Sequence, residues 1–360
     1  MINIHNRADS NFPISATWEY TWEIVCKAFD NLLSNKNITS SILSVLQNPT
    51  QLIVFYKNTD PLVSALYFTT GLIVIHYVMS EITKNYSQVD KAWSILPAIY
   101  AWHFTIHDYV LNNSFHPRLL AAAILISIWG TRLTYNFARK GGYYWSGQDY
   151  RYPYLREKLG APLMALLNIV FIAPFQDYLL LLMVTPLYIT NSLNSATGFR
   201  TTTLSTLDYT AIISHLTFLL IETIADEQQY VFQTEKYALL SHLKGSQLKG
   251  DYKHGFLWHS GLFQYSRHAN FFAEMSMWWV IYLFSVSAVQ EVSKTNDVGT
   301  FINWTIAGPL ILTGLFQGST WLTEKISSEK YPDYLKYRQS VSRFIPWFPS
   351  SNKHRSKKEL

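Results

Sequence analysis

The sequence predicts an all-α, polytopic membrane bundle with about seven transmembrane helices. Only 15% of the 360 residues are charged, while 49% are hydrophobic and 16% are aromatic. A soluble domain usually carries about 25% charged residues. Charged residues are absent mainly from several runs that are long enough to span a bilayer as a helix. A single cysteine, Cys26, excludes an intrachain disulfide and a cysteine-rich metal site.

Seven apolar runs are expected to form the spans. They are residues 62–79, 92–111, 119–137, 163–189, 209–225, 271–289 and 301–322. The fourth run holds Pro174, Gln176 and Asp177, so it is interpreted as either one bent span or a re-entrant helix followed by a span. Residues 1–60 are interpreted as a peripheral, lumenal segment without a cleavable signal peptide, 61–350 as the membrane domain and 351–360 as a basic tail.

Basic loops predict the orientation of the chain. The segments 138–158, 226–268 and 323–360 are rich in Lys and Arg, which favours the cytosolic side for them and for the C-terminus. The net charge of +5 is modest and comes partly from the tail, so it indicates membrane orientation and no nucleic-acid partner. Lys357 and Lys358 resemble a dilysine signal for retrieval to the endoplasmic reticulum by a coat; a solvated basic tail is the alternative.

Ionisable side chains within apolar runs are costly and often mark function. His215, Glu222 and Asp226 are seven and four residues apart, which places them on one helical face. They predict a functional polar stripe, with a structural polar cluster as the alternative.

A second polar group begins where a cytosolic loop becomes a span. Arg267, Asn270 and Glu274 share one face at spacings of three and four. The free N–H groups of a helix start, beside Arg267 and His268, suit an anionic phosphate. A helix cap with an arginine that reaches the surface is the alternative.

A third stripe contains Arg132, which needs a partner or must reach the surface. His103 and His107 have a spacing that can hold a metal, but the further paired histidines of a di-iron site are missing, so no metal is predicted. The sequence has neither Gly-x-Gly-x-x-Gly after a strand nor a phosphate-loop lysine motif, which argues against a soluble-type dinucleotide domain.

Taken in order, these motifs resemble the steroid 5α-reductase-like membrane oxidoreductases, in particular a branch of unknown function. The matching stretches are Val89-Asp90 with Trp93, Arg132-Leu133 with Tyr135 to Arg139 and Gly141-Gly142, Asp149-Tyr150-Arg151, Ala225-Asp226 with Gln228 and Phe232, Tyr265 to His268 with Asn270 to Phe272 and Glu274, and Glu324 with Tyr331-Pro332, Tyr334, Tyr337 and Phe344 to Trp347. The branch usually has Pro at the position of Ala269 and Gly at that of Ala273.

The resemblance implies a helical bundle with a cytosolic-side NADPH site. The residues that it assigns to the cofactor, directly or through an adjoining motif, are Glu222, Asp226, Arg267, His268, Asn270, Glu274, Glu324 and Tyr334. The sequence has no clear match to the glutamate and tyrosine that act on the enone in true steroid reductases, so steroid specificity is not implied.

The expected reaction is hydride transfer from NADPH to a C=C bond of a lipid or sterol-like substrate, with a proton donor supplied by the protein. Asp90, Tyr100 and His103 are the candidate catalytic residues, and His107 shares a helical face with the last two. Two alternatives stay open. One is an S-adenosylmethionine-dependent membrane methyltransferase, because the isoprenylcysteine methyltransferases share a similar motif. The other is a non-catalytic lipid-binding relative.

Overall fold

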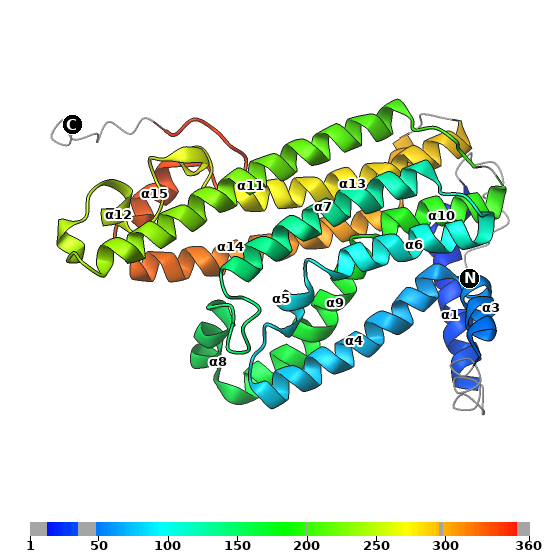
Figure 1. Ribbon diagram of the computed structural model, residues 1–360, viewed down its shortest axis with the longest axis horizontal. Coiled ribbons are helices and arrows are strands. Elements are labelled where there is room, and N and C mark those ends of the chain that lie inside the picture. The colour runs from blue at the N-terminus through cyan, green and yellow to red at the C-terminus, as the bar shows by residue number, and fades with distance from the viewer. Residues whose placement is uncertain (1–12, 35–47, 199, 295–297, 351–360) are drawn as a thin grey trace. The chain divides into compact units, whose positions relative to one another are not determined.

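The computed structural model describes residues 13–34, 48–198, 200–294 and 298–350, and this part of the chain contains helices and no β-strand (Figure 1). The predicted all-α class is confirmed. Lys357 and Lys358 and the rest of the basic tail lie outside the described residues, as do parts of the N-terminal segment. The helices form two compact units, Met1–Ile213 with Trp278–Ile311 and Ser214–Met277 with Leu312–Leu360.

The first unit contains nine complete α-helices within the described residues. They are α1 (Trp18–Ser34), α3 (Pro49–Asn58), α4 (Pro61–Thr83), α5 (Gln88–Ala92), α6 (Leu96–Asn112), α7 (Pro117–Arg139), α8 (Arg151–Leu167), α9 (Ala173–Leu182) and α10 (Thr185–Thr197). Helices α6 and α7 lie side by side, and α4 packs against α9 (Figure 1). Helix α4 begins with Pro61, and the Asp60 carboxylate caps it by accepting a 2.8 Å hydrogen bond from the Leu62 N–H.

Three longer helices contribute residues to both units. They are α11 (Thr206–Leu240), α13 (Ala269–Ser293) and α14 (Ala307–Lys330). The second unit adds the short helices α12 (Gly250–His254) and α15 (Tyr334–Ser340). Two buried apolar clusters hold the second unit together. One contains Ala225, Phe232, Leu257, Phe263 and Ala269, and the other contains Phe256, Tyr334, Tyr337 and Val341.

Four helical stretches of the described chain are long and apolar enough to cross a membrane. They are α4, residues Arg151–Leu182 across α8 and α9, α11 and α13. Large apolar side chains on α4, such as Ile75 and Ile82, are 56% and 73% exposed, as expected where lipid covers the helix. The protein is therefore a helical membrane bundle. The other expected spans also form helices, and the number of seven spans stays a prediction.

Two expected spans differ from the helices observed. In the run 163–189, the helix continues through a π-helical turn at Asn168–Ile172 into α9 and ends at Leu182, and α10 begins anew with Pro186 in its first turn. In the run 301–322, the long α-helix begins only at Ala307. Before it, the Asn303 side chain accepts a hydrogen bond from the Thr305 N–H and starts a short 3-10 turn.

A buried arginine joins three helices of the first unit. Arg118 on α7 is 2% exposed, and its Nε and Nη2 donate to the two carboxylate oxygens of Asp208 over 2.8 and 2.9 Å. The same Nη2 lies 2.9 Å from Glu291 Oε2. The bidentate pair with Asp208 and the contact with Glu291 satisfy the hydrogen-bond donors of the buried guanidinium. They therefore hold α7 against α11 and α13.

Candidate functional site

A cluster of buried polar side chains lies on α11 and α13 within the second unit. Glu222 and Asp226 are one turn apart on α11, and Asn270 and Glu274 are one turn apart on α13. The three carboxylates are only 4–7% exposed, and Asn270 Nδ2 donates to Asp226 Oδ1 over 3.2 Å. The structure therefore brings together the two polar stripes that the sequence placed on separate helices. Burial of three carboxylates is costly, which makes this a strongly polar site.

An ionic cluster surrounds Glu324 in the same unit. Arg267 Nε donates to Glu324 Oε1 over 2.7 Å, His268 Nε2 lies 3.1 Å from the same oxygen, and Arg338 Nε lies 3.1 Å from Oε2. Burial alone would raise the pKa of the Glu324 carboxyl, but the hydrogen bonds from His268 and Arg267 outweigh it and lower the pKa to about 2. Burial also lowers the pKa of the His268 imidazole. Glu324 is therefore a carboxylate at neutral pH.

Arg267 also holds the C-terminal segment. Its Nη1 donates to the backbone oxygens of Arg338 and Val341, and its backbone N–H donates to the Ser342 oxygen over 2.9 Å. These contacts and the pair with Glu324 use Nε and Nη1 of the guanidinium. We therefore interpret Arg267 as a positioning residue, while a direct contact with a cofactor stays a prediction.

Tyr334 lies in the aromatic cluster that anchors the same segment. Its ring centroid is 4.9 Å from that of Phe256 and 5.6 Å from that of Tyr337, and it is 5% exposed. The Tyr337 hydroxyl donates to the Phe263 backbone oxygen over 2.7 Å. Tyr334 is thus placed to hold α15 in position, and its contact with a cofactor remains a prediction.

Two arginines of the C-terminal segment were missed by the sequence reasoning. Arg338 is 41% exposed at its side chain, and Arg343 donates from both terminal nitrogens to Gln317 over 3.2 Å. The Arg343 guanidinium lies over the Phe344 ring, which in turn packs against His268. These half-exposed cations near the start of α13 are better placed to meet an anion than Arg267. The concentration of basic residues in 336–343 was the sequence feature that could have indicated these two arginines.

The candidate catalytic residue Asp90 lies in the first unit, beside Tyr152 and Asp149. The Tyr152 hydroxyl is 3.5 Å from Asp90 Oδ1, while Oδ2 is buried without a hydrogen-bond partner among the described residues. Burial, followed by the negative charge of Asp149, raises the pKa of Asp90 to about 6, although Arg151 opposes the shift. Asp90 can therefore gain or lose a proton near neutral pH.

Tyr100 and His103 each have partners of their own on α4 and α3. The Tyr100 hydroxyl lies 2.8 Å from Thr69 Oγ1. His103 Nδ1 lies 3.0 Å from the Tyr56 hydroxyl, and its Nε2 lies 2.8 Å from the Pro61 backbone oxygen. These contacts tie α6 to its neighbours, and a catalytic role for either residue stays a prediction.

A histidine–aspartate pair inside the first unit was not predicted. His76 Nδ1 on α4 lies 2.8 Å from Asp177 Oδ2 on α9, with side chains 12% and 0% exposed. A carboxylate that orients an imidazole is an arrangement used for acid–base chemistry. Asp177 stood out in its apolar run, but its partner is 101 residues earlier in the sequence.

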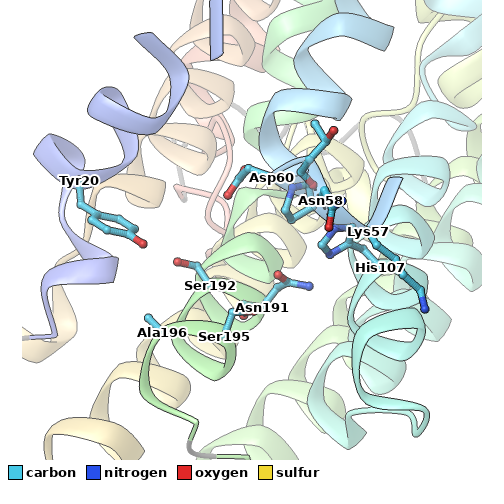
Figure 2. Close-up of a pocket in the computed structure, with 11 residues that line it drawn as sticks. Tyr20, Lys57, Asn58, Asp60, His107, Asn191, Ser192, Ser195 and Ala196 are labelled. Carbon is cyan, nitrogen blue, oxygen red and sulfur yellow. Dashed lines mark hydrogen bonds between the residues drawn. The ribbon is translucent and has the colours of Figure 1, made fainter. Parts of the chain in front are cut away.

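A polar cavity of about 260 Å³ opens at the α1 and α10 side of the first unit. Figure 2 shows Tyr20 of α1 and Asn191, Ser192 and Ser195 of α10 around it. His107 also lines it, and His107 Nε2 lies 3.1 Å from the Thr59 backbone oxygen. The cavity therefore combines neutral hydrogen-bonding groups with His107 and the charged residues Lys57 and Asp60, and it shares none of the residues assigned to the cofactor.

The fold and these clusters define a helical membrane protein with buried polar groups in both units. The chain belongs to the family described as "Protein of unknown function (DUF1295)", whose model matches residues 76–343. It is 35% identical over 312 residues to Uncharacterized protein C594.04c of Schizosaccharomyces pombe, which covers 83% of each chain. No solved structure matches. The family match begins at His76 and ends at Arg343, so it includes every candidate catalytic and cofactor residue.

Proposed function

We propose that the protein is an NADPH-dependent membrane oxidoreductase that reduces a C=C bond of a lipid or sterol-like substrate. One observation carries the proposal. All eight residues that the steroid 5α-reductase-like resemblance assigns to the cofactor belong to the second unit, and five of them meet in two clusters. These five are Asp226 with Asn270, and Arg267 and His268 with Glu324.

The two clusters suit different parts of a dinucleotide. The start of α13 suits phosphates, because a helix N-terminus attracts anions and the cations Arg338 and Arg343 lie nearby. Asn270, hydrogen-bonded to Asp226, offers groups for a ribose or a carboxamide. NADPH would supply the hydride when bound, and this chain would supply the position of the cofactor and a proton.

Among the candidate proton donors, Asp90 lies outside the expected spans and has a pKa that suits proton donation near neutral pH. A general acid is most effective when its pKa lies near the working pH. The pKa of Asp90 is raised to about 6, mainly by burial. Asp90 is therefore the first residue to test as the donor, ahead of Tyr100 and His103.

A second candidate function is methyl transfer from S-adenosylmethionine. The observation that favours it is the group of three buried carboxylates, Glu222, Asp226 and Glu274. S-adenosylmethionine carries a sulfonium and an ammonium, which carboxylates stabilise, whereas NADPH is strongly anionic. The arginines near α13 favour NADPH, so reduction remains the first proposal.

The compartment and topology are part of this proposal. Positive loops favour a cytosolic C-terminus and a lumenal N-terminus. Lys357 and Lys358 would then face the cytosol, where a coat protein can recognise them and return the protein to the endoplasmic reticulum. Replacement of both lysines by serine in a tagged full-length chain should shift the protein to later compartments. Unchanged localisation would remove this part of the proposal.

Mass spectrometry of cofactors released from the full-length protein, purified in a mild detergent, tests the proposed function. Recovery of NADP(H) in near-stoichiometric amount supports reduction. Recovery of S-adenosylmethionine or its demethylated product instead supports the second candidate. If neither is recovered and neither binds when added, both catalytic proposals fail and a non-catalytic lipid-binding protein is favoured. Lipids that change when NADPH is added to membranes containing the protein would then identify the substrate.

A further inference from the structure

A groove between side chains of α6 and α7 contains none of the residues assigned to the cofactor. It has a volume of about 620 Å³ and belongs to the first unit. The residues that line it are Trp102 on α6 and Ile124, Ser127, Ile128, Thr131, Arg132 and Tyr135 on α7. Ile124 and Ile128 are each 44% exposed, and Tyr135 is 65% exposed. The groove is thus open to the surroundings of the bundle.

Three polar groups in the wall of this groove, on Trp102, Ser127 and Thr131, already donate hydrogen bonds within the protein. Trp102 Nε1 donates to Ser127 Oγ over 2.9 Å, and Ser127 Oγ donates to the Ala123 backbone oxygen over 2.7 Å. Thr131 Oγ1 donates to the Ser127 backbone oxygen over 2.8 Å. The wall therefore behaves as an apolar surface along most of its length. Arg132 is the only charged side chain among the seven lining residues.

The polarity of the groove changes in one direction along α7. Ile124, Ile128 and Arg132 follow one another at intervals of one turn, so the apolar part extends roughly 12 Å before the guanidinium is reached. Tyr135 comes next, and Arg139, the last residue of α7, places its guanidinium over the Tyr135 ring at 5.4 Å. A lipid in one leaflet has the same order, with an acyl chain toward the bilayer centre and a headgroup toward the interface.

We propose that this groove binds an anionic lipid of the surrounding bilayer. One acyl chain lies along Ile124 and Ile128, and the phosphate or carboxylate of the headgroup pairs with Arg132, with Arg139 about two turns nearer the interface. The charge complementarity of Arg132 selects an anionic headgroup over a zwitterionic one. The site is independent of the proposed reaction, because none of its residues belongs to the cofactor set.

Native mass spectrometry of the full-length protein in a neutral detergent tests this proposal, with dioleoyl phosphatidic acid and dioleoyl phosphatidylcholine as probes. We expect the anionic lipid to bind about tenfold more tightly, as charge-assisted hydrogen bonds to a guanidinium imply. Arg132→Gln should remove this preference, and Arg132→Lys should keep part of it because the charge remains. Glycerol 3-phosphate, which has the headgroup without the chains, should not compete.

Ile128→Trp fills the groove without altering a charge, so it should weaken the binding of both lipids. Ile75→Trp makes the same change at an exposed position of α4, 56% exposed, and serves as the matched control with unchanged binding. Equal affinity of the normal protein for the two lipids overturns the proposal. So does phosphatidic acid binding that survives Ile128→Trp or is competed by glycerol 3-phosphate. If Arg132→Gln does not fold, the comparison of the two lipids, the Ile128→Trp variant and the competition with glycerol 3-phosphate still test the proposal.

Discussion

Arg267, in the loop before α13, donates its Nε hydrogen bond to Glu324 on α14 over 2.7 Å, and both side chains are at most 8% exposed. His268 and Arg338 approach the same carboxylate. Glu324 therefore pairs with the guanidinium groups of Arg267 and Arg338 and also meets the His268 imidazole in the second unit. Its removal would leave the buried Arg267 guanidinium without a counter-charge, which is costly in a buried environment.

Glu324→Ala should lower the stability of the protein substantially. Loss of one member of a buried ion pair typically costs about 3–5 kcal/mol, because the remaining charges stay buried. The midpoint of thermal unfolding in detergent measures the effect. Glu329→Ala, at an exposed position on the same helix, is the control and should change stability by no more than about 0.5 kcal/mol. Equal midpoints for the two variants would contradict the role given to Glu324.

The same carboxylate predicts a dependence of stability on pH. The folded pKa of Glu324 is about 2, below its usual value, so its contribution is complete above about pH 4.5 and is lost as the pH falls toward 2. The shift corresponds to about 3 kcal/mol. The lowered pKa of His268 adds a loss that begins below about pH 6.5. Unfolding midpoints should therefore fall in acid, and Glu324→Gln should lack the part below pH 4.5. Parallel curves for the two proteins would refute the assignment.

The closeness of α7 to the segment before α6 predicts a steric effect. A Cβ at Gly130 on α7 would clash with the backbone oxygen of Ser94, whereas a Cβ at Gly71 on α4 would meet nothing. Gly130→Ala should therefore destabilise the protein by about 1–3 kcal/mol, as overpacking usually does. Gly71→Ala should be neutral or stabilising by up to about 1 kcal/mol. Thermal unfolding of the two variants checks the difference, and the reverse order would contradict this packing.

The sequence predicted the helical class and most apolar runs because bilayer length and helical period act locally. The expected span 62–79 lies within α4, and 271–289 lies within α13. The span expected at 209–225 continues as α11 to Leu240, because polar residues can extend a helix beyond the apolar part. The π-helical turn at Asn168–Ile172 was harder to locate, since it depends on how prolines and neighbouring helices share the backbone hydrogen bonds.

Pairings between distant residues could not be predicted in the same way. The helical period placed Asn270 and Glu274 on one face and Glu222 and Asp226 on another, but only the packing of helices decides that the faces meet. The pair His76–Asp177 was missed for this reason. Likewise, Arg267 donates to backbone oxygens of the C-terminal segment, and because every residue has such an oxygen, no sequence pattern predicts the contact.

Calorimetric titration of NADPH and of S-adenosylmethionine into the full-length protein in detergent tests directly whether the second unit holds a nucleotide. We expect NADPH to bind and Asp226→Asn to weaken its binding at least tenfold, whereas Glu227→Gln, an exposed neighbour with the same loss of charge, should leave it unchanged. Equal affinity of the two variants, or no binding of NADPH by the folded protein, would contradict the claim that the second unit holds the nucleotide.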